Sequence, residues 1–249
     1  MFSENNSTSV MIGSPMYNGN CYFGYTSSLI ENVLDLRQNN IGAYWTFLPN
    51  ESLITRGRNY IVDIFMKSQC SHLMFIDADI VFPSNSIRTL LSAGEDIICA
   101  PYPKKFIDWD AVEAASKLEN RESLDKYTSS YVINYIDNAN PPVPDYRGVV
   151  EVAHAGTGFM LISRKVFEIM TPHVPKARPS NFGRFNVWYN EYFRTGIGHD
   201  SVFMSEDWLF CEEWRNIGGK VHLMPGIKLD HIGTHIYTGS IGISGANVT

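Results

Sequence analysis

Short apolar runs alternate with amphipathic segments along the first hundred residues of the chain. Apolar positions three and four residues apart predict helices, whereas short runs rich in β-branched and aromatic residues predict strands. The strands predicted in this way are Ser9–Gly13, Gly42–Phe47, His72–Asp77 and Glu95–Ala100. The helices predicted between them are Ser27–Gln38, Thr55–Ser68 and Asn85–Leu91. This alternation predicts an α/β fold, in which a mostly parallel central sheet carries helices on both faces.

The pattern is less regular after residue 103. Helices are predicted over Trp109–Glu119 and from Ser205 to the pair Gly218-Gly219, and strands over Val149–Ala153, Phe159–Ser163 and Lys220–Met224. Pro141, Pro142 and Pro144 exclude a helix or a central strand in their loop. Residues 104–147 are therefore predicted to be an insertion, and the aromatic-rich residues 172–200 a lid over a binding site. Residues 1–249 are expected to form one domain.

Composition narrows the classes of function. The 249 residues are 44% hydrophobic and 18% charged, values typical of a globular protein. Acidic residues outnumber basic ones by 26 to 20, and this net charge of −6 argues against nucleic acid as a partner. No apolar run reaches the roughly 18–20 residues of a transmembrane segment, and the polar N-terminus lacks a signal-peptide pattern, so a cytoplasmic protein is expected. The four cysteines have no CxxC spacing, so reduced, buried thiols are expected instead of a zinc site.

The first candidate site is the sequence Asp77-Ala78-Asp79, which follows an apolar strand. The carboxyl ends of parallel strands open into the crevice in which α/β folds bind ligands. Two carboxylates there repel each other unless a cation joins them, and hard divalent ions prefer oxygen ligands and keep substrate phosphates in their shell. The pattern favours a metal site, although two solvated aspartates that cap the strand end would give the same sequence.

The second candidate site is Ser205-Glu206-Asp207-Trp208, at the start of a predicted helix. In one interpretation Ser205 is the N-cap and the two acids interact favourably with the helix dipole. In the other, a carboxylate is held at the edge of a cleft as a general base, with Trp208 as a flat neighbour.

The third candidate site lies late in the chain, at Asp230-His231-Ile232-Gly233-Thr234-His235. A lone histidine is more often structural than a ligand. A neutral imidazole after a strand and beside a glycine can, however, complete the coordination of a cation bound by Asp79. His231 is the first candidate for this ligand and His235 is the competing one.

Together these motifs resemble the GT-A glycosyltransferases, which use nucleotide sugars and have a Rossmann-like N-terminal half. The resemblance covers most of the chain and rests on the opening strand and loop (Ser9–Tyr17), the DxD of Asp77–Asp79, the acids at 206–207 and the His-x-Gly of His231–Gly233. Three further segments are similar to parts of family-2-like members. Thr55–Asn59 resembles a nucleotide-contacting segment, Tyr102–Lys105 with Trp109 a loop over the sugar, and Gly156–Phe159 a turn beneath donor and acceptor.

The resemblance implies a role for each matching residue. Residues 1–103 would bind the nucleotide sugar, UDP by default, and residues 104–249 a glycan or another hydroxyl acceptor. The donor site would comprise Pro15, Met16, Tyr17, Arg56, Asn59, Asp77, Ala78, Lys105, Trp109, Gly156, Thr157 and Gly158. Asp79 and His231, with Asp77, would bind Mn²⁺ or Mg²⁺, which would neutralise the leaving diphosphate.

The remaining roles concern charge and proton transfer. Arg56, Arg58, Lys104 and Lys105 are the cations available to the diphosphate, unless they are solvated surface residues. Asp207, beside Glu206, would remove the proton from the acceptor hydroxyl, and the sugar would be inverted.

Three alternatives stay open. A retaining enzyme of the same fold needs no such base, so the acids at 206 and 207 would orient the acceptor. A nucleotidyltransferase would show a long Gly-rich, Arg-containing phosphate loop after the first strand, whereas Gly13–Tyr17 is short. A non-catalytic sugar-binding relative would tolerate loss of the base and the metal ligands, yet candidates for all of them are present.

Overall fold

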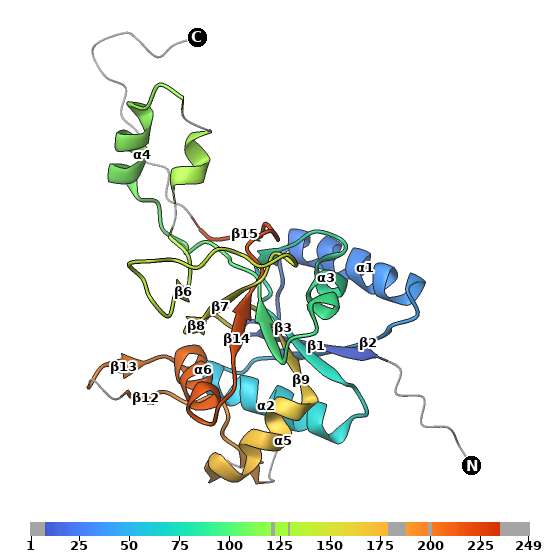
Figure 1. The fold of residues 1–249 in the computed structure, drawn as a ribbon. Helices are drawn as coiled ribbons and strands as arrows, with labels where there is room; N and C mark the ends of the chain where they lie inside the picture. The colour runs from blue at the N-terminus through green and yellow to red at the C-terminus, as the bar shows by residue number, and fades with distance from the viewer. Residues whose placement is uncertain (1–7, 121–122, 129, 179–187, 199–200, 235–249) are drawn as a thin grey trace.

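A computed structural model describes residues 8–120, 123–128, 130–178, 188–198 and 201–234. Its centre is a seven-stranded sheet in the order β2-β1-β3-β9-β5-β14-β7 (Figure 1). The strands are β1 (Ser9–Met16), β2 (Gly42–Pro49), β3 (His72–Ile76), β5 (Ile97–Cys99), β7 (Val150–Val152), β9 (Phe159–Ser163) and β14 (Val221–Leu223). Strands β7 and β9 run antiparallel to the other five. The predicted α/β fold with a mostly parallel sheet is confirmed.

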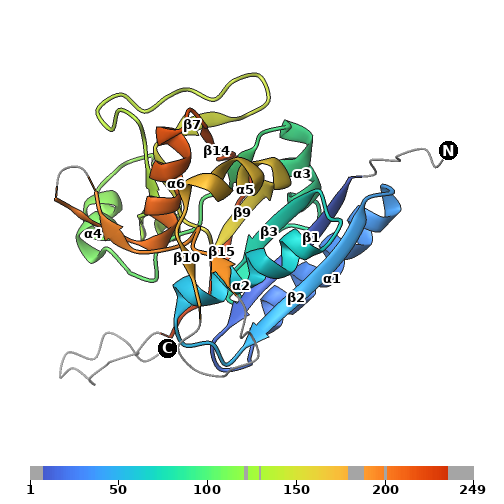
Figure 2. The same ribbon diagram turned by 90° about the horizontal axis from the view of Figure 1, so that it is seen from below.

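Helices cover both faces of this sheet (Figure 1 and Figure 2). The first face carries α1 (Phe23–Gln38) and α3 (Ser86–Ala93), and the second carries α2 (Ile54–Lys67), α5 (Arg164–Met170) and α6 (Glu206–Asn216). In β3, Leu73 and Phe75 belong to the core on the α2 side, whereas Met74 and Ile76 belong to the core on the α1 side. A strand of consecutive apolar residues is thus buried on both faces. No helix in these ranges is both long and apolar enough to cross a bilayer.

The structure adds elements that the sequence pattern did not predict. Helix α1 begins at Phe23, before the predicted start, because buried Tyr25 anchors an additional turn. Helix α5 and the 3-10 turn η2 (Thr171–His173) are too short to show a clear period. Four two-stranded ladders accompany the main sheet. They pair β4 (Ile80–Val81) with β15 (Asp230–His231), β6 (Ile133–Asn134) with β8 (His154–Ala155), β10 (Lys176–Ala177) with β11 (Tyr189–Asn190), and β12 (Gly196–Ile197) with β13 (Phe203–Met204).

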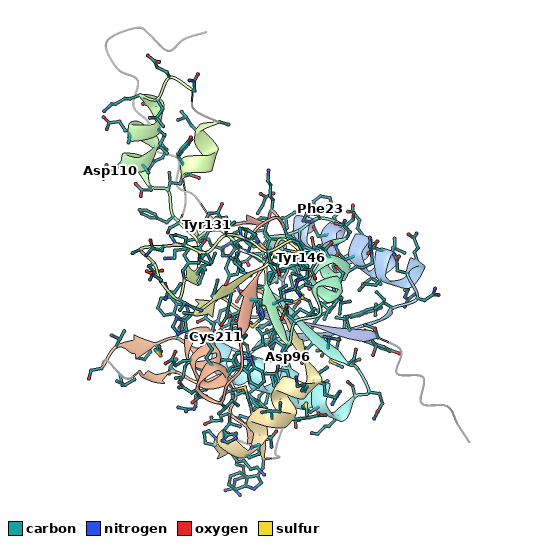
Figure 3. All side chains as sticks on the ribbon, viewed as in Figure 1. Phe23, Asp96, Asp110, Tyr131, Tyr146 and Cys211 are labelled. Atoms are coloured by element: carbon teal, nitrogen blue, oxygen red, sulfur yellow. The ribbon has the colours of Figure 1, made fainter. Side chains whose placement is uncertain are left out.

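Part of the sequence between β5 and β7 stands apart from the body. Figure 1 shows α4 (Trp109–Ser116) and the 3-10 turn η1 (Leu124–Tyr127) projecting away from the sheet. In Figure 3, Asp110 lies on this projection and Tyr131 near its base. The proline loop at residues 138–145 contains neither helix nor strand, as predicted. Of the predicted lid, residues 179–187 and 199–200 lie outside the described residues.

The cysteines differ in exposure. Cys70, Cys99 and Cys211 are buried free thiols, and Figure 3 shows Cys211 inside the body on α6. Cys21 is a free thiol but is exposed, so the expectation that all four are buried is wrong. Its position explains the difference, because Cys21 lies in the loop between β1 and α1 and not in a core element.

Candidate functional site

The carboxyl ends of β1 and β3 open into a cleft of about 990 Å³. It collects side chains from segments that are far apart in the chain. The residues predicted from the sequence that line it are Pro15, Met16, Tyr17, Asp77, Ala78, Asp79, Lys105, Glu206, Asp207 and His231. The fold therefore brings all three candidate motifs to one place.

The short ladder between β4 and β15 holds Asp79 beside His231. Asp79 directly precedes β4, and His231 on β15 is opposite Ile80. The backbone N–H of Ile232 donates to the carbonyl of Asp79 at 2.8 Å, which extends the ladder past Ile80. As a result, Oδ1 of Asp79 lies 3.4 Å from Nε2 of His231.

The donor atoms of this pair fit a hard divalent cation. Oδ1 of Asp79 is buried and has no hydrogen-bond partner among the described residues. Nδ1 of His231 lies 2.8 Å from the carbonyl oxygen of Pro103, and because a carbonyl only accepts, this nitrogen carries the proton. In the neutral ring the lone pair is then on Nε2, which faces Asp79. Adjacent octahedral ligands at about 2.1 Å from a metal lie roughly 3.0 Å apart, so a small adjustment of the pair would suffice.

The pair does not form a complete metal cage. Within the described ranges, no group of three or more His, Cys, Asp or Glu side chains is arranged to hold a metal ion. Magnesium-type sites commonly use one or two protein ligands and take the others from water and substrate phosphates. The arrangement therefore suits an ion that binds together with a phosphate-containing substrate.

Lys105 occupies the other side of the Asp79 carboxylate, where its Nζ contacts Oδ2. Burial raises the pKa of Asp79, but His231, when its Nε2 carries a proton, and the ammonium of Lys105 outweigh this effect and hold the pKa below its usual value. Asp79 is therefore ionised at neutral pH, as a metal ligand has to be.

Arg58 on α2 connects the DxD motif with the acids of α6. Its side chain is 4% exposed, with Nη2 3.3 Å from Asp77 Oδ1 and Nε 3.4 Å from Glu206 Oε1. Burial opposes its charge, but the carboxylates of Asp77 and Glu206 outweigh the burial and raise the pKa of Arg58. Its Nη1 is buried and has no partner in the described part of the chain. Arg58 lines the cleft, so its positive charge is available to a ligand bound there.

The sequence reasoning named Arg58 as one of several cations available to the diphosphate but left open that it is a solvated surface residue, and it did not predict the burial. A signal was present, because Arg58 precedes Ile61 by three and Phe65 by seven residues in a helix whose apolar face contains both. That spacing puts Arg58 on the buried face of α2.

Asp207 lies in the first turn of α6 at the edge of the cleft. Its Oδ1 accepts hydrogen bonds from Ser205 Oγ and from the backbone N–H of Trp208. Ser205 is at the N-cap position, but its hydroxyl bonds the carboxylate and not a backbone N–H, so the N-cap interpretation is wrong in this respect. The hydrogen bond between a hydroxyl and an ionised carboxylate is stronger than the one between a hydroxyl and a backbone N–H. Oδ2 of Asp207 has no hydrogen bond in the described structure.

Gly156 and Gly158 leave space for the side chain of Tyr102. Tyr102 lines the cleft, whereas the two glycines do not. A Cβ on Gly156 would lie 2.1 Å from the Tyr102 hydroxyl, and one on Gly158 would lie 2.9 Å from Asp77 Oδ2. Burial and the charge of Asp77 raise the pKa of Tyr102. The Tyr102 ring contacts His231 edge-on, with 5.4 Å between centroids, so this turn supports the imidazole indirectly.

Several residues of the predicted donor site lie elsewhere. Arg56 forms a two-bond ion pair with Glu51, at 2.6 and 2.8 Å. Buried Asn59 exchanges hydrogen bonds with the backbone of Phe193, and Trp109 is exposed on α4. Thr157 is fully buried in the glycine turn. His235, the competing metal ligand, lies outside the described residues.

The cleft also contains residues that the sequence reasoning did not assign to the site. They are Asn18, Asn20, Cys21, Tyr22, Glu51, Ser52, Ile54 and Val132. Most follow the carboxyl ends of β1 and β2, and loops at these strand ends are where α/β folds bind ligands. This rule, applied to both strands, would have predicted that these loops line the site.

Comparison with known proteins gives matches to solved structures. No protein-family model and no curated protein matches the chain. It is similar to S. aureus TarS 1–349, with 10% identity over 90% of this chain and 60% of that one and a TM-score of 0.45. It is also similar to GalNAc-T7 with UDP, GalNAc and Mn²⁺, with 10% identity over 92% and 44% and a TM-score of 0.45. A third is the inositol-1-phosphate CTP transferase from T. maritima, with 8% identity over 91% and 89% and a TM-score of 0.39.

The first two of these structures are glycosyltransferases. This chain spans less than two thirds of the length of either, and identities of about a tenth do not transfer an activity. The chemistry of the cleft has to be argued from its own residues.

Proposed function

We propose that the protein is a metal-dependent glycosyltransferase that moves a sugar from a nucleoside-diphosphate sugar to a hydroxyl acceptor. The observation that carries the proposal is the convergence of three features in one cleft. These are the Asp79–His231 pair, the buried Arg58 with an unpaired donor, and Asp207 with an unbonded carboxylate oxygen. We further propose UDP as the nucleotide, a glycan as the acceptor and inversion at the sugar.

The donor half of the cleft suits a diphosphate leaving group. Cleavage of a sugar–phosphate bond places negative charge on the diphosphate, and Mn²⁺ or Mg²⁺ held by Asp79 and His231 would stabilise that charge. Arg58, Lys104 and Lys105 line the same cleft and would supply further positive charge. The loop after β1 offers the exposed ring of Tyr17 as apolar surface for the base.

The acceptor half supports Asp207 over Glu206 as the base. Glu206 already has a partner in Arg58, whose Nε lies 3.4 Å from its Oε1. Asp207 is oriented through Oδ1 by Ser205 and Trp208, while Oδ2 is available to an acceptor hydroxyl. A base in this position would favour in-line attack on the anomeric carbon and therefore inversion.

The test is release of nucleoside diphosphate from a panel of UDP-, GDP- and dTDP-sugars, with Mn²⁺ and with EDTA. We expect release from at least one donor, and we expect EDTA to abolish it. Absence of both release and metal-dependent binding for every donor would refute the proposal. Formation of pyrophosphate from a nucleoside triphosphate and a sugar phosphate would identify a nucleotidyltransferase instead. A retained anomeric configuration in the product would remove Asp207 from the role of base.

A further inference from the structure

Lys105 neutralises the carboxylate that is proposed to bind the metal. Its Nζ contacts Oδ2 of Asp79, while Oδ1 of the same carboxylate faces His231. The side chain of Lys105 is 41% exposed, and the residue lies at the edge of the cleft. Nζ therefore sits on the metal ligand itself, yet solvent reaches the side chain and leaves it room to move.

The path of the Lys105 side chain is built into the fold. A Cβ on Gly233 would lie 3.0 Å from Cδ of Lys105 and 3.2 Å from its Cγ, so the stem of the lysine crosses the backbone of Gly233. Gly233 lies two residues after His231 and is the glycine of the His-x-Gly motif. The close approach of Lys105 explains why a glycine occupies this position. It leaves space for the lysine that reaches Asp79.

We propose that Lys105 is a built-in counter-ion that competes with the divalent cation for Asp79 until a diphosphate draws the ammonium away. This inference rests on the proposed function, since it assumes the metal site at Asp79 and His231. A cation bound at that pair would place two positive charges close to a third, and like charges at such distances repel. Lys105 thereby weakens metal binding when no substrate is present.

A diphosphate changes this balance. It offers Lys105 a second anionic partner, and the ammonium can leave Asp79 without losing its charge compensation. Metal and diphosphate then strengthen the binding of each other by the same factor, as linkage requires. The protein would hold its metal tightly only with a donor in the cleft, and Lys105 would carry part of that coupling.

The test measures Mn²⁺ binding without nucleotide, from the electron paramagnetic resonance signal of the free ion. We expect Lys105→Met to bind Mn²⁺ about tenfold more tightly than the wild type, since one nearby positive charge is removed. Lys105→Arg keeps the charge and should keep the wild-type affinity. Lys117→Met, which removes an exposed lysine that pairs with Glu113 outside the cleft, is the matched control and should bind Mn²⁺ like the wild type. Gly233→Ala should shift the affinity in the direction of Lys105→Met, because the new methyl group displaces the stem.

A second arm measures UDP binding at saturating Mn²⁺ by calorimetry. We expect Lys105→Met to bind UDP about tenfold more weakly than the wild type, because the diphosphate loses its partner. Unchanged or weaker Mn²⁺ binding by Lys105→Met, with normal binding by the wild type, would overturn the inference and leave the proposed function intact. Tighter Mn²⁺ binding with unchanged UDP binding would overturn the coupling. If neither the wild type nor any variant bound Mn²⁺, the metal site itself would be wrong, and the proposed function would fail with it.

Discussion

Charged side chains gather at both ends of the parallel strands of the sheet, but the two ends differ in how the charges are partnered. At the amino end, Asp96, labelled in Figure 3, pairs with Lys165 at 2.8 Å, and this lysine is 63% exposed. At the carboxyl end, Arg58 is 4% exposed and is shared between Asp77 and Glu206. The first cluster is more exposed, although Arg147 links Glu95 and Asp145 within it, and the second consists of connected charges inside a cleft.

The difference separates a surface from a binding site. Exposed ion pairs contribute about 0–1 kcal/mol in general, and they require nothing further from their surroundings. Buried charges lose hydration and need every partner that the fold can supply. Nevertheless, Nη1 of Arg58 and Oδ1 of Asp79 are buried without a hydrogen bond in the described structure. A cluster left incomplete in this way is suited to a ligand that completes it.

The largest effect is expected for Asp79→Asn, with Asp96→Asn, before the amino end of β5, as the matched control at the opposite side of the sheet. Loss of the Asp79 charge should abolish Mn²⁺ binding and lower metal-dependent release of nucleoside diphosphate by roughly 10³-fold or more, since a metal contributes several kcal/mol to charge stabilisation. Asp96→Asn should leave both quantities unchanged. Isothermal titration with Mn²⁺ and the release assay measure them. Equal behaviour of the two variants would show that the amino and carboxyl ends of the strands do not differ in function.

Asp207→Asn should affect transfer and leave donor binding intact. The amide cannot accept the proton of the acceptor hydroxyl, so the transfer rate should fall by a factor of about 10²–10⁴. The affinity for UDP in the presence of Mn²⁺ should stay at the wild-type value, because the structure gives Asp207 no contact with the metal-binding pair. Steady-state kinetics with a saturating donor, together with UDP titrations, separate the two effects. A variant with full transfer activity would point to another base or to retention.

Replacement of Arg58 should reduce stability as well as binding. Arg58→Met leaves Asp77 and Glu206 without their shared partner, and we expect the free energy of unfolding to fall by about 2–4 kcal/mol. Arg147→Met is the control at the amino end, where the arginine pairs with Glu95 at 2.7 Å in a more exposed setting, and its loss should be smaller. Urea denaturation of the two variants gives the comparison. A similar loss in both would contradict the distinction between the two clusters.

Much of this arrangement was accessible from the sequence. Apolar runs and helical spacing predicted the strands and helices of the first hundred residues, because both depend on local periods. The position of Asp77 and Asp79 at a strand end followed from the same reasoning. The spacing of apolar residues could not predict that β9 lies between β3 and β5, because the choice of a neighbouring strand depends on contacts between distant segments.

The contacts of the cleft depend on such distant segments as well. His231 reaches Asp79 because a two-residue strand pairs with β4, and a strand of that length leaves no pattern in the sequence. Lys105 reaches the same carboxylate across Gly233, a contact between segments with no local relation. Residue types therefore indicated the chemistry, while long-range pairing decided which side chains meet.

The smallest effect is expected at the amino end of β3, where His72 gives stability a pH dependence. His72 hydrogen-bonds to Ser71 Oγ at 2.9 Å, and burial lowers its pKa below 6.5, an effect that the charge of Asp96 partly offsets. The unfolded chain therefore takes up this proton at a higher pH than the folded protein does. The free energy of unfolding should be unaffected above the unfolded pKa and should fall as the pH drops below it towards the lower folded pKa. Urea denaturation between about pH 8 and pH 5 measures this slope, which should be shallower in His72→Gln, whereas an identical slope in the variant would assign it to another group.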